Sequence, residues 1–88
     1  MKIVFTTRFR RSYERLVAKN EKIEAVFAEH MSLFSKKSMD SSLKDHALHG
    51  KLKGYRTFSL GYDLRALYRK TRPAYIFFDI GTYDDIYR

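Results

Sequence analysis

The chain has 88 residues and a formal net charge of +8, with seven phenylalanines, seven tyrosines and no cysteine. This length supports one small domain with one core, so residues 1–88 are treated as a single domain. The absence of cysteine excludes a disulfide framework and a thiolate metal site. Because no signal peptide is recognised and no apolar run approaches the roughly 20 residues of a membrane span, we expect a cytoplasmic protein without a membrane partner.

Positive charge is concentrated in the middle of the sequence. Residues 36–72 carry ten basic and three acidic side chains, whereas residues 1–35 carry seven and four, and residues 73–88 carry one and three. Aromatic residues are interleaved with the basic ones, which is typical of surfaces that bind nucleic acid. A basic face that is merely solvated is the alternative interpretation.

Two helices are predicted in the first half, after a short strand at residues 2–6. Thr6 or Thr7 can cap the first helix, and Asn20 is expected to end it and to cap the second. The apolar residues of both helices recur at helical spacing. They are Phe9, Tyr13, Leu16 and Val17 in the first helix and Ile23, Val26, Phe27, His30, Met31 and Phe34 in the second.

Four strands are predicted in the second half, after a polar loop at residues 35–43. There the apolar period changes to two, which indicates strands. The predicted strands cover residues 47–52, 55–60, 64–70 and 74–80. Their connections are so short that neighbouring strands must be antiparallel. The predicted fold class is therefore α+β, with two helices packed on one face of a curled antiparallel sheet and the other face left open.

Alternation along the strands assigns side chains to the two faces of the sheet. The residues expected to face the helices are Leu64, Ala66, Tyr68, Ile76, Phe78 and Ile80. Arg65, Leu67 and Arg69 are left on the open side. The register of residues 55–60 stays undecided, because a shift of one residue exchanges the faces. If Phe58 points inward, Arg56 shares its parity.

The segment that follows the last strand, residues 81–88, gathers polar and aromatic groups at the end of the sheet. A glycine at this point lets the backbone turn sharply. Tyr83 and Tyr87 would then be displayed in a position that suits binding or catalysis better than packing. Asp84 and Asp85 are expected to be turn residues.

Asp45, His46 and His49 invite a metal-site interpretation. A spacing of three between histidines suits a helix, however, whereas this segment reads as extended, and no third ligand cluster is evident. We therefore expect neither a metal nor a cofactor, and we assign His49 to a surface or phosphate contact.

Three segments resemble the RelE/ParE superfamily of small toxins from type II toxin–antitoxin systems, closest to its YafQ-like branch. They are LKDHALHGKLKG at residues 43–54, YRTFSLGYDLRALYR at residues 55–69 and IGTYDDIY at residues 80–87. The resemblance implies a metal-independent endoribonuclease that cleaves mRNA, at the ribosome. It also implies inhibition by a cognate antitoxin that supplies an acidic, amphipathic segment. The expected assembly is a monomeric toxin or a toxin–antitoxin hetero-oligomer.

The same resemblance assigns roles to individual residues. His46 falls at a catalytic histidine of the branch, Asp63 at its acidic residue and Tyr87 at its terminal aromatic position. Two departures stand out, because Tyr83 and Ser59 occupy positions that are usually histidine. A general base would take the proton of the ribose 2′-OH, which attacks the adjacent phosphorus, and a general acid would protonate the leaving oxygen.

His46, Asp63 and Tyr83 are the resulting acid–base candidates, and Tyr87 would stack on a base, orient it or donate a proton. The resemblance assigns Arg56 and Arg65 to the phosphate. Further RNA or ribosome contacts are expected from Lys51, Lys53, His49 and Arg69.

Two alternatives of other classes stay open. A ParE-like inhibitor of DNA gyrase would share the fold but bind a protein and leave RNA intact. A module that binds RNA or the ribosome without cleaving would show salt-dependent binding and produce no fragments with 5′-hydroxyl ends.

Overall fold

A computed structural model describes residues 2–36, 40–61 and 63–87 of the chain. The centre of the predicted polar loop (residues 37–39), the turn residue Tyr62 and the terminal Arg88 lie outside the described residues. The helices and strands in chain order are β1 (Lys2–Phe5), α1 (Thr7–Lys19), α2 (Lys22–Lys36), η1 (Ser41–Leu43), β2 (His46–Ala47), η2 (Gly50–Leu52), β3 (Arg56–Gly61), β4 (Leu64–Lys70), β5 (Ala74–Thr82) and α3 (Tyr83–Tyr87). Among the described helices, none is long and apolar enough to cross a membrane.

The predicted ends of α1 and α2 are confirmed by their capping contacts. The Thr6 hydroxyl accepts a hydrogen bond from the Phe9 backbone N–H at 3.1 Å and donates to the Phe78 carbonyl at 3.1 Å, which ties the start of α1 to β5. Asn20 ends α1, and its side-chain oxygen accepts from the Lys22 backbone N–H at 3.1 Å at the start of α2. Both helices therefore begin where a short polar side chain accepts a hydrogen bond from an exposed backbone N–H.

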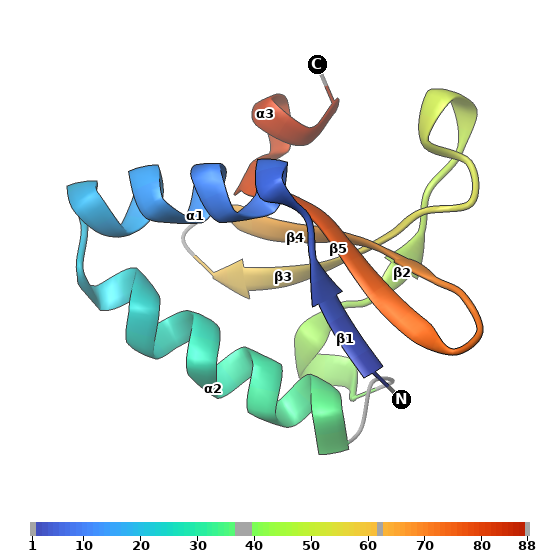
Figure 1. Ribbon diagram of the computed structural model, residues 1–88, viewed down its shortest axis with the longest axis horizontal. Helices are drawn as coiled ribbons and strands as arrows, with labels where there is room; N and C mark the ends of the chain where they lie inside the picture. Colours follow the sequence, from blue (N-terminus) through green and yellow to red (C-terminus); the bar gives the residue numbers. More distant parts are fainter. Residues whose placement is uncertain (1, 37–39, 62, 88) are drawn as a thin grey trace.

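The sheet has five strands in the order β1-β5-β4-β3-β2. The predicted antiparallel pairing is confirmed for β2 to β5, while β1 pairs in parallel with β5 at one edge. This parallel pair is possible because α1 and α2 separate β1 from the later strands along the chain. Figure 1 shows the two helices running alongside the curled sheet.

The main core lies between the sheet and the pair α1 and α2. Its fully buried members include Phe34, Phe58 and Phe77, and Phe34 stacks on Phe58 with 5.1 Å between ring centroids. Phe58 and Leu60 both belong to this core, so the register that the sequence left undecided is settled: Thr57 and Ser59 point to the other face. We call this other side, which carries Thr57, Ser59 and Arg65, the far face of the sheet.

Two predictions of strand facing, those for Ile76 and Phe78, are wrong, because Tyr75 and Phe77 pack with the main core instead. Phe78 was expected to contact the helices, but Phe77 occupies the core and Phe78 packs on the far face. The register of β4 and β5 shifts between Leu67 and Tyr68, which pair with Asp79 and Phe77. Such a bulge places one extra residue in β5 and so exchanges the faces of the residues before it.

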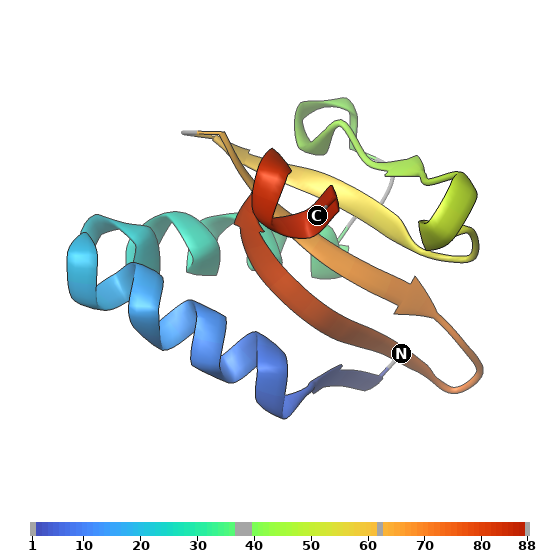
Figure 2. The ribbon, with the colours of Figure 1, turned by 90° about the horizontal axis from the view of Figure 1, so that it is seen from above.

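The far face is partly covered, in contrast to the open face that the sequence suggested. The predicted strand at residues 47–52 is reduced to the two residues of β2, and η2 follows it as a helical turn. Leu48, Leu67 and Ile86 form a second buried cluster there, with Leu52, Tyr55 and Phe78 around it. The short helix α3 thereby folds back onto the sheet, as Figure 2 shows.

Candidate functional site

Arg65 lies at the centre of the far face. Its cross-strand neighbours are Ser59 on β3 and Gly81 on β5, both of which are small. Its guanidinium carbon lies 5.3 Å from the centroid of the Tyr83 ring, a cation–π arrangement. The Nε of Arg65 is buried and has no hydrogen-bond partner among the described residues. The protein therefore holds at least one N–H donor in place without using it.

The helix α3 reaches this position because Gly81 has no side chain. A Cβ atom at Gly81 would lie 2.9 Å from the Cβ of Asp85. The Asp85 carboxylate accepts from the Thr82 N–H at 3.1 Å, and the Thr82 hydroxyl accepts from the Asp85 N–H at 3.2 Å. This reciprocal pair is a capping box, and it agrees with the structural role that the sequence suggested for Asp85.

Tyr83 and Tyr87 stack on each other at the surface of α3. Their ring centroids are 4.3 Å apart, at 27° between the planes, and the two residues are 49% and 36% exposed. A spacing of four residues places side chains one above the other on a helix. Two exposed rings with a guanidinium beside them form a surface on which a nucleic-acid base can stack.

Tyr87 also lines a small cavity of about 230 Å³ together with residues of the η2 segment. The lining includes His49 and Lys51, while Leu52 and Ile86 supply its apolar wall. The structure thus brings His49 and Lys51 next to Tyr87, although about 35 residues of sequence separate them. The Leu48–Leu67–Ile86 cluster holds the two segments together.

His46 belongs to the same face through strand pairing. It lies opposite Thr57 on β3, which in turn lies opposite Leu67 on β4. The Nδ1 atom of His46 is 2.9 Å from the Lys44 carbonyl oxygen. Because a carbonyl can only accept, Nδ1 carries the proton and the neutral ring leaves Nε2 free to accept one. His46 is exposed and is therefore accessible to a substrate.

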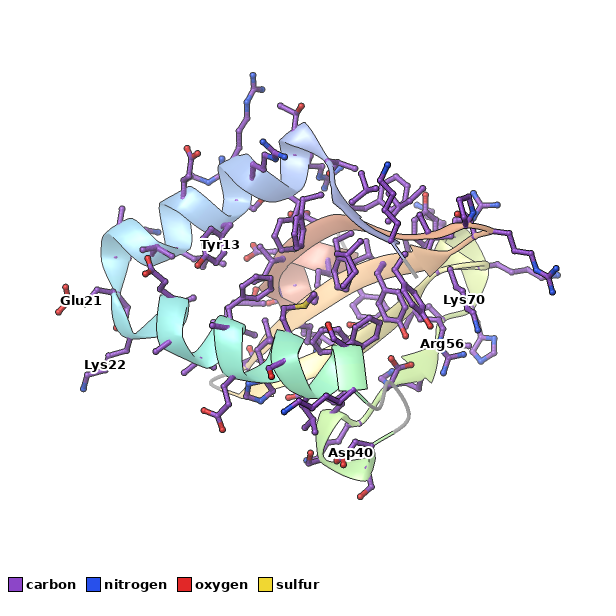
Figure 3. The ribbon with its side chains drawn as sticks, turned by 60° about the horizontal axis from the view of Figure 1, so that its bottom comes forward. Tyr13, Glu21, Lys22, Asp40, Arg56 and Lys70 are labelled. Atoms are coloured by element: carbon purple, nitrogen blue, oxygen red, sulfur yellow. The ribbon has the colours of Figure 1, made fainter. Side chains whose placement is uncertain are left out.

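Arg56 lies on the opposite, helix-facing side and has a structural contact there. Its Nε donates to the Asp45 carboxylate at 2.8 Å, and the Tyr68 hydroxyl donates to the other carboxylate oxygen. The Asp45 side chain is only 2% exposed. Burial, and then the hydrogen bond to Asp45, raise the pKa of Tyr68, so its hydroxyl keeps its proton. Arg56, labelled in Figure 3, is not part of the Arg65 group.

The remaining predicted site residues, Asp63, Arg69 and Lys53, form no hydrogen bond, ion pair or cation–π contact with Arg65 or Tyr83 among the described residues. Asp63 is exposed at the turn between β3 and β4, with φ 62°, a left-handed conformation that aspartate tolerates. Arg69 is exposed near the C-terminal end of β4 and pairs with Ile76 of β5. Lys53 is exposed directly after η2.

A metal-binding cluster is not found in the described part of the chain. No group of three or more His, Cys, Asp or Glu side chains gathers within residues 2–36, 40–61 and 63–87. Asp45, which precedes His46 in the sequence, directs its carboxylate to Arg56 and Tyr68 instead.

The arrangement offers three chemical capacities on one face. Arg65 can donate hydrogen bonds to a phosphate, the Tyr83–Tyr87 pair can stack on a base, and His46 can accept a proton. Sequence reasoning named these residues but did not predict the helix α3, which places Tyr83 beside Arg65. The signal was present in the spacing of the two tyrosines and in Thr82 and Asp85, which together predict a helical turn rather than a loop.

In the comparisons with known proteins, a family model identifies the family of the chain and solved structures show its fold. A family model described as the bacterial toxin of type II toxin–antitoxin system, YafQ, matches residues 1–88. The crystal structure of YafQ from E. coli strain BL21(DE3) is 24% identical, with 99% of this chain and 98% of that chain covered and a TM-score of 0.82. A chain of the E. coli DinJ–YafQ toxin–antitoxin complex is 24% identical, with coverage of 99% and 97% and a TM-score of 0.79.

A YoeB/ParE toxin from Agrobacterium tumefaciens shares the fold at 16% identity, with coverage of 94% and 99% and a TM-score of 0.78. No curated protein sequence matches the chain.

Proposed function

The chain belongs to the YafQ family of bacterial toxins from type II toxin–antitoxin systems, and from this premise we propose that it is an endoribonuclease that cleaves mRNA, at the ribosome, without a metal ion. The observation that carries the proposal is the state of Arg65. It presents a buried, unused N–H among the described residues, beside the ring of Tyr83 and on the same sheet face as His46. Together these three side chains suit a nucleotide of RNA: Arg65 for its phosphate, Tyr83 for its base and His46 for its ribose hydroxyl.

The proposed reaction uses the ribose 2′-OH as its nucleophile. Nε2 of His46 accepts the hydroxyl proton, and the oxygen forms a bond to the adjacent phosphorus while the bond to the 5′-oxygen of the next nucleotide breaks. Arg65 stabilises the negative charge that develops on the phosphate oxygens. The products are a 2′,3′-cyclic phosphate and a 5′-hydroxyl, so no water and no metal ion enter this step.

The leaving 5′-oxygen needs a proton, and Tyr83 or Tyr87 is proposed to supply it. A tyrosine hydroxyl carries a proton that it can donate to a leaving oxygen, so it suits the acid step. His46 lies two strands away from Arg65 and two residues farther along β4, a separation of about 12 Å between Cα atoms at ordinary strand dimensions. This distance leaves room for a ribose and its phosphate between the base and the cation. Asp63 is kept as a second acid–base candidate, because it is exposed two residues before Arg65.

Binding is proposed to involve both the RNA and protein partners. His49 and Lys51 line the cavity beside Tyr87 and would contact RNA there, with Lys53 and Arg69 farther along the surface. Arg56 is left out of the phosphate site because it already pairs with Asp45. A solved relative is a toxin–antitoxin complex, which supports a cognate antitoxin as the inhibitory partner of this chain.

The test is cleavage of mRNA on translating ribosomes by purified protein variants. His46→Ala is expected to slow cleavage by about 10²–10⁴-fold, the usual contribution of a general base. Arg65→Ala should slow it comparably, and His30→Gln, a histidine change on the helix side, should not. A wild-type protein that leaves mRNA whole but stops DNA supercoiling would support the gyrase alternative. Salt-dependent RNA binding without any fragments would support a non-cleaving module.

A further inference from the structure

A second basic surface lies along α1, outside the group around Arg65. A groove of about 580 Å³ runs between α1 and the end of β5, where α3 begins. Four cationic side chains of α1 line it: Arg8, Arg11, Arg15 and Lys19. The acidic side chains in its lining are Asp79 and Asp85, so cations outnumber carboxylates by four to two.

The four cations form a regular row. Their spacing of three, four and four residues keeps them on one side of the helix, while Phe9 faces the core from another side. At a rise of 1.5 Å per residue, successive cations are about 4.5–6 Å apart along the axis. A row of positive charges with this repeat matches a polymer that carries one negative charge per unit.

Arg8, at one end of the row, is held by a contact within the protein, whereas the other three cations can bind a ligand. Asp79 is buried, accepts from the Ser12 hydroxyl at 2.6 Å and pairs with Arg8 at 3.1 Å. By contrast, Arg11 and Lys19 are exposed and form no ion pair with any residue that the structure describes. Arg15 donates to the Ser12 hydroxyl at 3.3 Å and also has no ion pair within residues 2–36, 40–61 and 63–87.

The groove adjoins the proposed cleavage site across α3. Asp85 lines the groove, whereas Tyr83 and Tyr87 stack on the Arg65 side of the same short helix. Asp85 lies two residues from each tyrosine, and such a spacing points to opposite sides of a helix. An RNA chain bound at the proposed cleavage site beside Tyr83 would therefore reach the cations of α1 by passing over α3.

We propose that the α1 groove binds the phosphate backbone of the RNA that flanks the cleaved bond. This inference rests on the proposed function for the identity of its ligand. The planar guanidinium of arginine binds phosphate oxygens through paired hydrogen bonds. Binding of an RNA phosphate backbone does not require apolar side chains in the groove. Only Leu16 and Ile80 are apolar in this lining.

An acidic protein segment is the other conceivable ligand, and a different surface suits it better. Amphipathic segments dock by inserting apolar side chains into grooves. An apolar groove of about 310 Å³ lies on the other side of α1, lined by Phe5, Phe9, Tyr13 and Phe27 among others. Tyr13 points from α1 towards α2 at this groove, as Figure 3 shows, with its ring 5.1 Å from that of Phe27.

The experiment measures the salt dependence of binding to a 2′-O-methyl RNA oligonucleotide, which lacks the nucleophile and stays intact. The test protein carries Arg11→Ala, Arg15→Ala and Lys19→Ala. The matched control carries Lys2→Ala, Lys22→Ala and Lys36→Ala, three exposed cations that do not line the groove. Each phosphate contact with a single strand contributes about 0.7 to the slope of log K against log salt, so the test slope should fall by about 2. The control slope should stay unchanged.

Equal slope changes in the two triple variants, or no change in either, would overturn the proposal. Loss of binding to an acidic peptide of glutamates, with RNA binding retained, would assign the groove to a protein partner instead. With unmodified RNA, the test variant should raise KM for a long substrate and leave kcat within about twofold, since uniform binding alone is removed. If the wild-type protein cleaves nothing but the slope difference appears, the cleavage proposal fails while the groove still binds phosphates.

Discussion

Gly81 is the residue on which the position of Tyr83 and Tyr87 depends. Its position beneath Asp85 allows α3 to fold back within one residue of the end of β5. Any side chain there must push α3 away from the sheet, because the nearest atoms are those of Asp85 at 2.9 Å. The stack beside Arg65 would move with α3.

We predict that Gly81→Ala destabilises the protein by about 1–3 kcal/mol, the usual cost of overpacking, and reduces cleavage. Urea unfolding measures the first effect. Because the clash is with the Asp85 side chain, the same change should cost less in a protein that already carries Asp85→Gly. Equal costs in both backgrounds would mean that α3 does not pack on Gly81.

From the sequence resemblance we expect Tyr83 to stand at a position that is usually histidine, and in the structure its ring contacts Arg65 and Tyr87. We predict that Tyr83→His preserves or raises cleavage at neutral pH, because an imidazole titrates near 6.5 and can donate a proton readily. Single-turnover cleavage rates over a range of pH measure this. A large loss of rate in a folded variant would show that the phenol itself is required.

Among the elements, β2 is the shortest and carries His46. Only two residues of pairing hold it to β3, but Asp45 beside it is clamped by Arg56 and Tyr68. The buried contact of Asp45 therefore fixes the position of β2, whereas β4 and β5 are held in place by many hydrogen bonds between strands. His46 acquires a fixed position on the far face without a long strand.

We predict that Asp45→Asn weakens this clamp and costs about 2–4 kcal/mol of stability. The value is somewhat below that of a fully buried pair, because the Arg56 side chain is 31% exposed. Cleavage should also fall in conditions where the variant stays folded, since His46 loses its support. Thermal unfolding and cleavage rates give the two readings, with Glu29→Gln on the exposed side of α2 as the control. Unchanged stability would show that the carboxylate is not needed.

The elements that the sequence predicted well are those whose burial pattern spans several turns or pleats. Phe9 to Val17 and Ile23 to Phe34 mark helices, and the apolar alternation of β4 fixes its faces. The sequence could not reveal the bulge that exchanges Phe77 and Phe78, because a register shift depends on the partner strand. The helix α3 was also missed: its five residues are too few for an apolar period, and its signal lies in the capping pair Thr82 and Asp85 instead.

The candidate site was predictable in part, for the same reason. Arg65 and the residues of α3 could be named from their chemistry and resemblance, but their contact needs α3 to fold over Gly81. Arg56 is the opposite case: the resemblance assigned it to a phosphate, whereas its position on the helix-facing side of β3 lets it pair with Asp45.

For the molecule as a whole, the cations considered for RNA binding lie on two surfaces rather than one. The far face carries Arg65 with its tyrosines, and α1 carries a row of arginines that the charge count of the middle segment does not include. Electrostatic attraction to RNA is therefore expected from both sides of α3. The apolar groove on the other side of α1 is where we expect a protein partner to bind.

The most direct measurement is the chemistry of RNA ends after brief exposure of translating ribosomes to the purified protein. The account predicts fragments with 5′-hydroxyl and 2′,3′-cyclic phosphate ends, and no cleavage after a nucleotide whose 2′-OH is replaced by hydrogen. Fragments with 5′-phosphate ends, or cleavage that persists at the 2′-deoxy position, would contradict it.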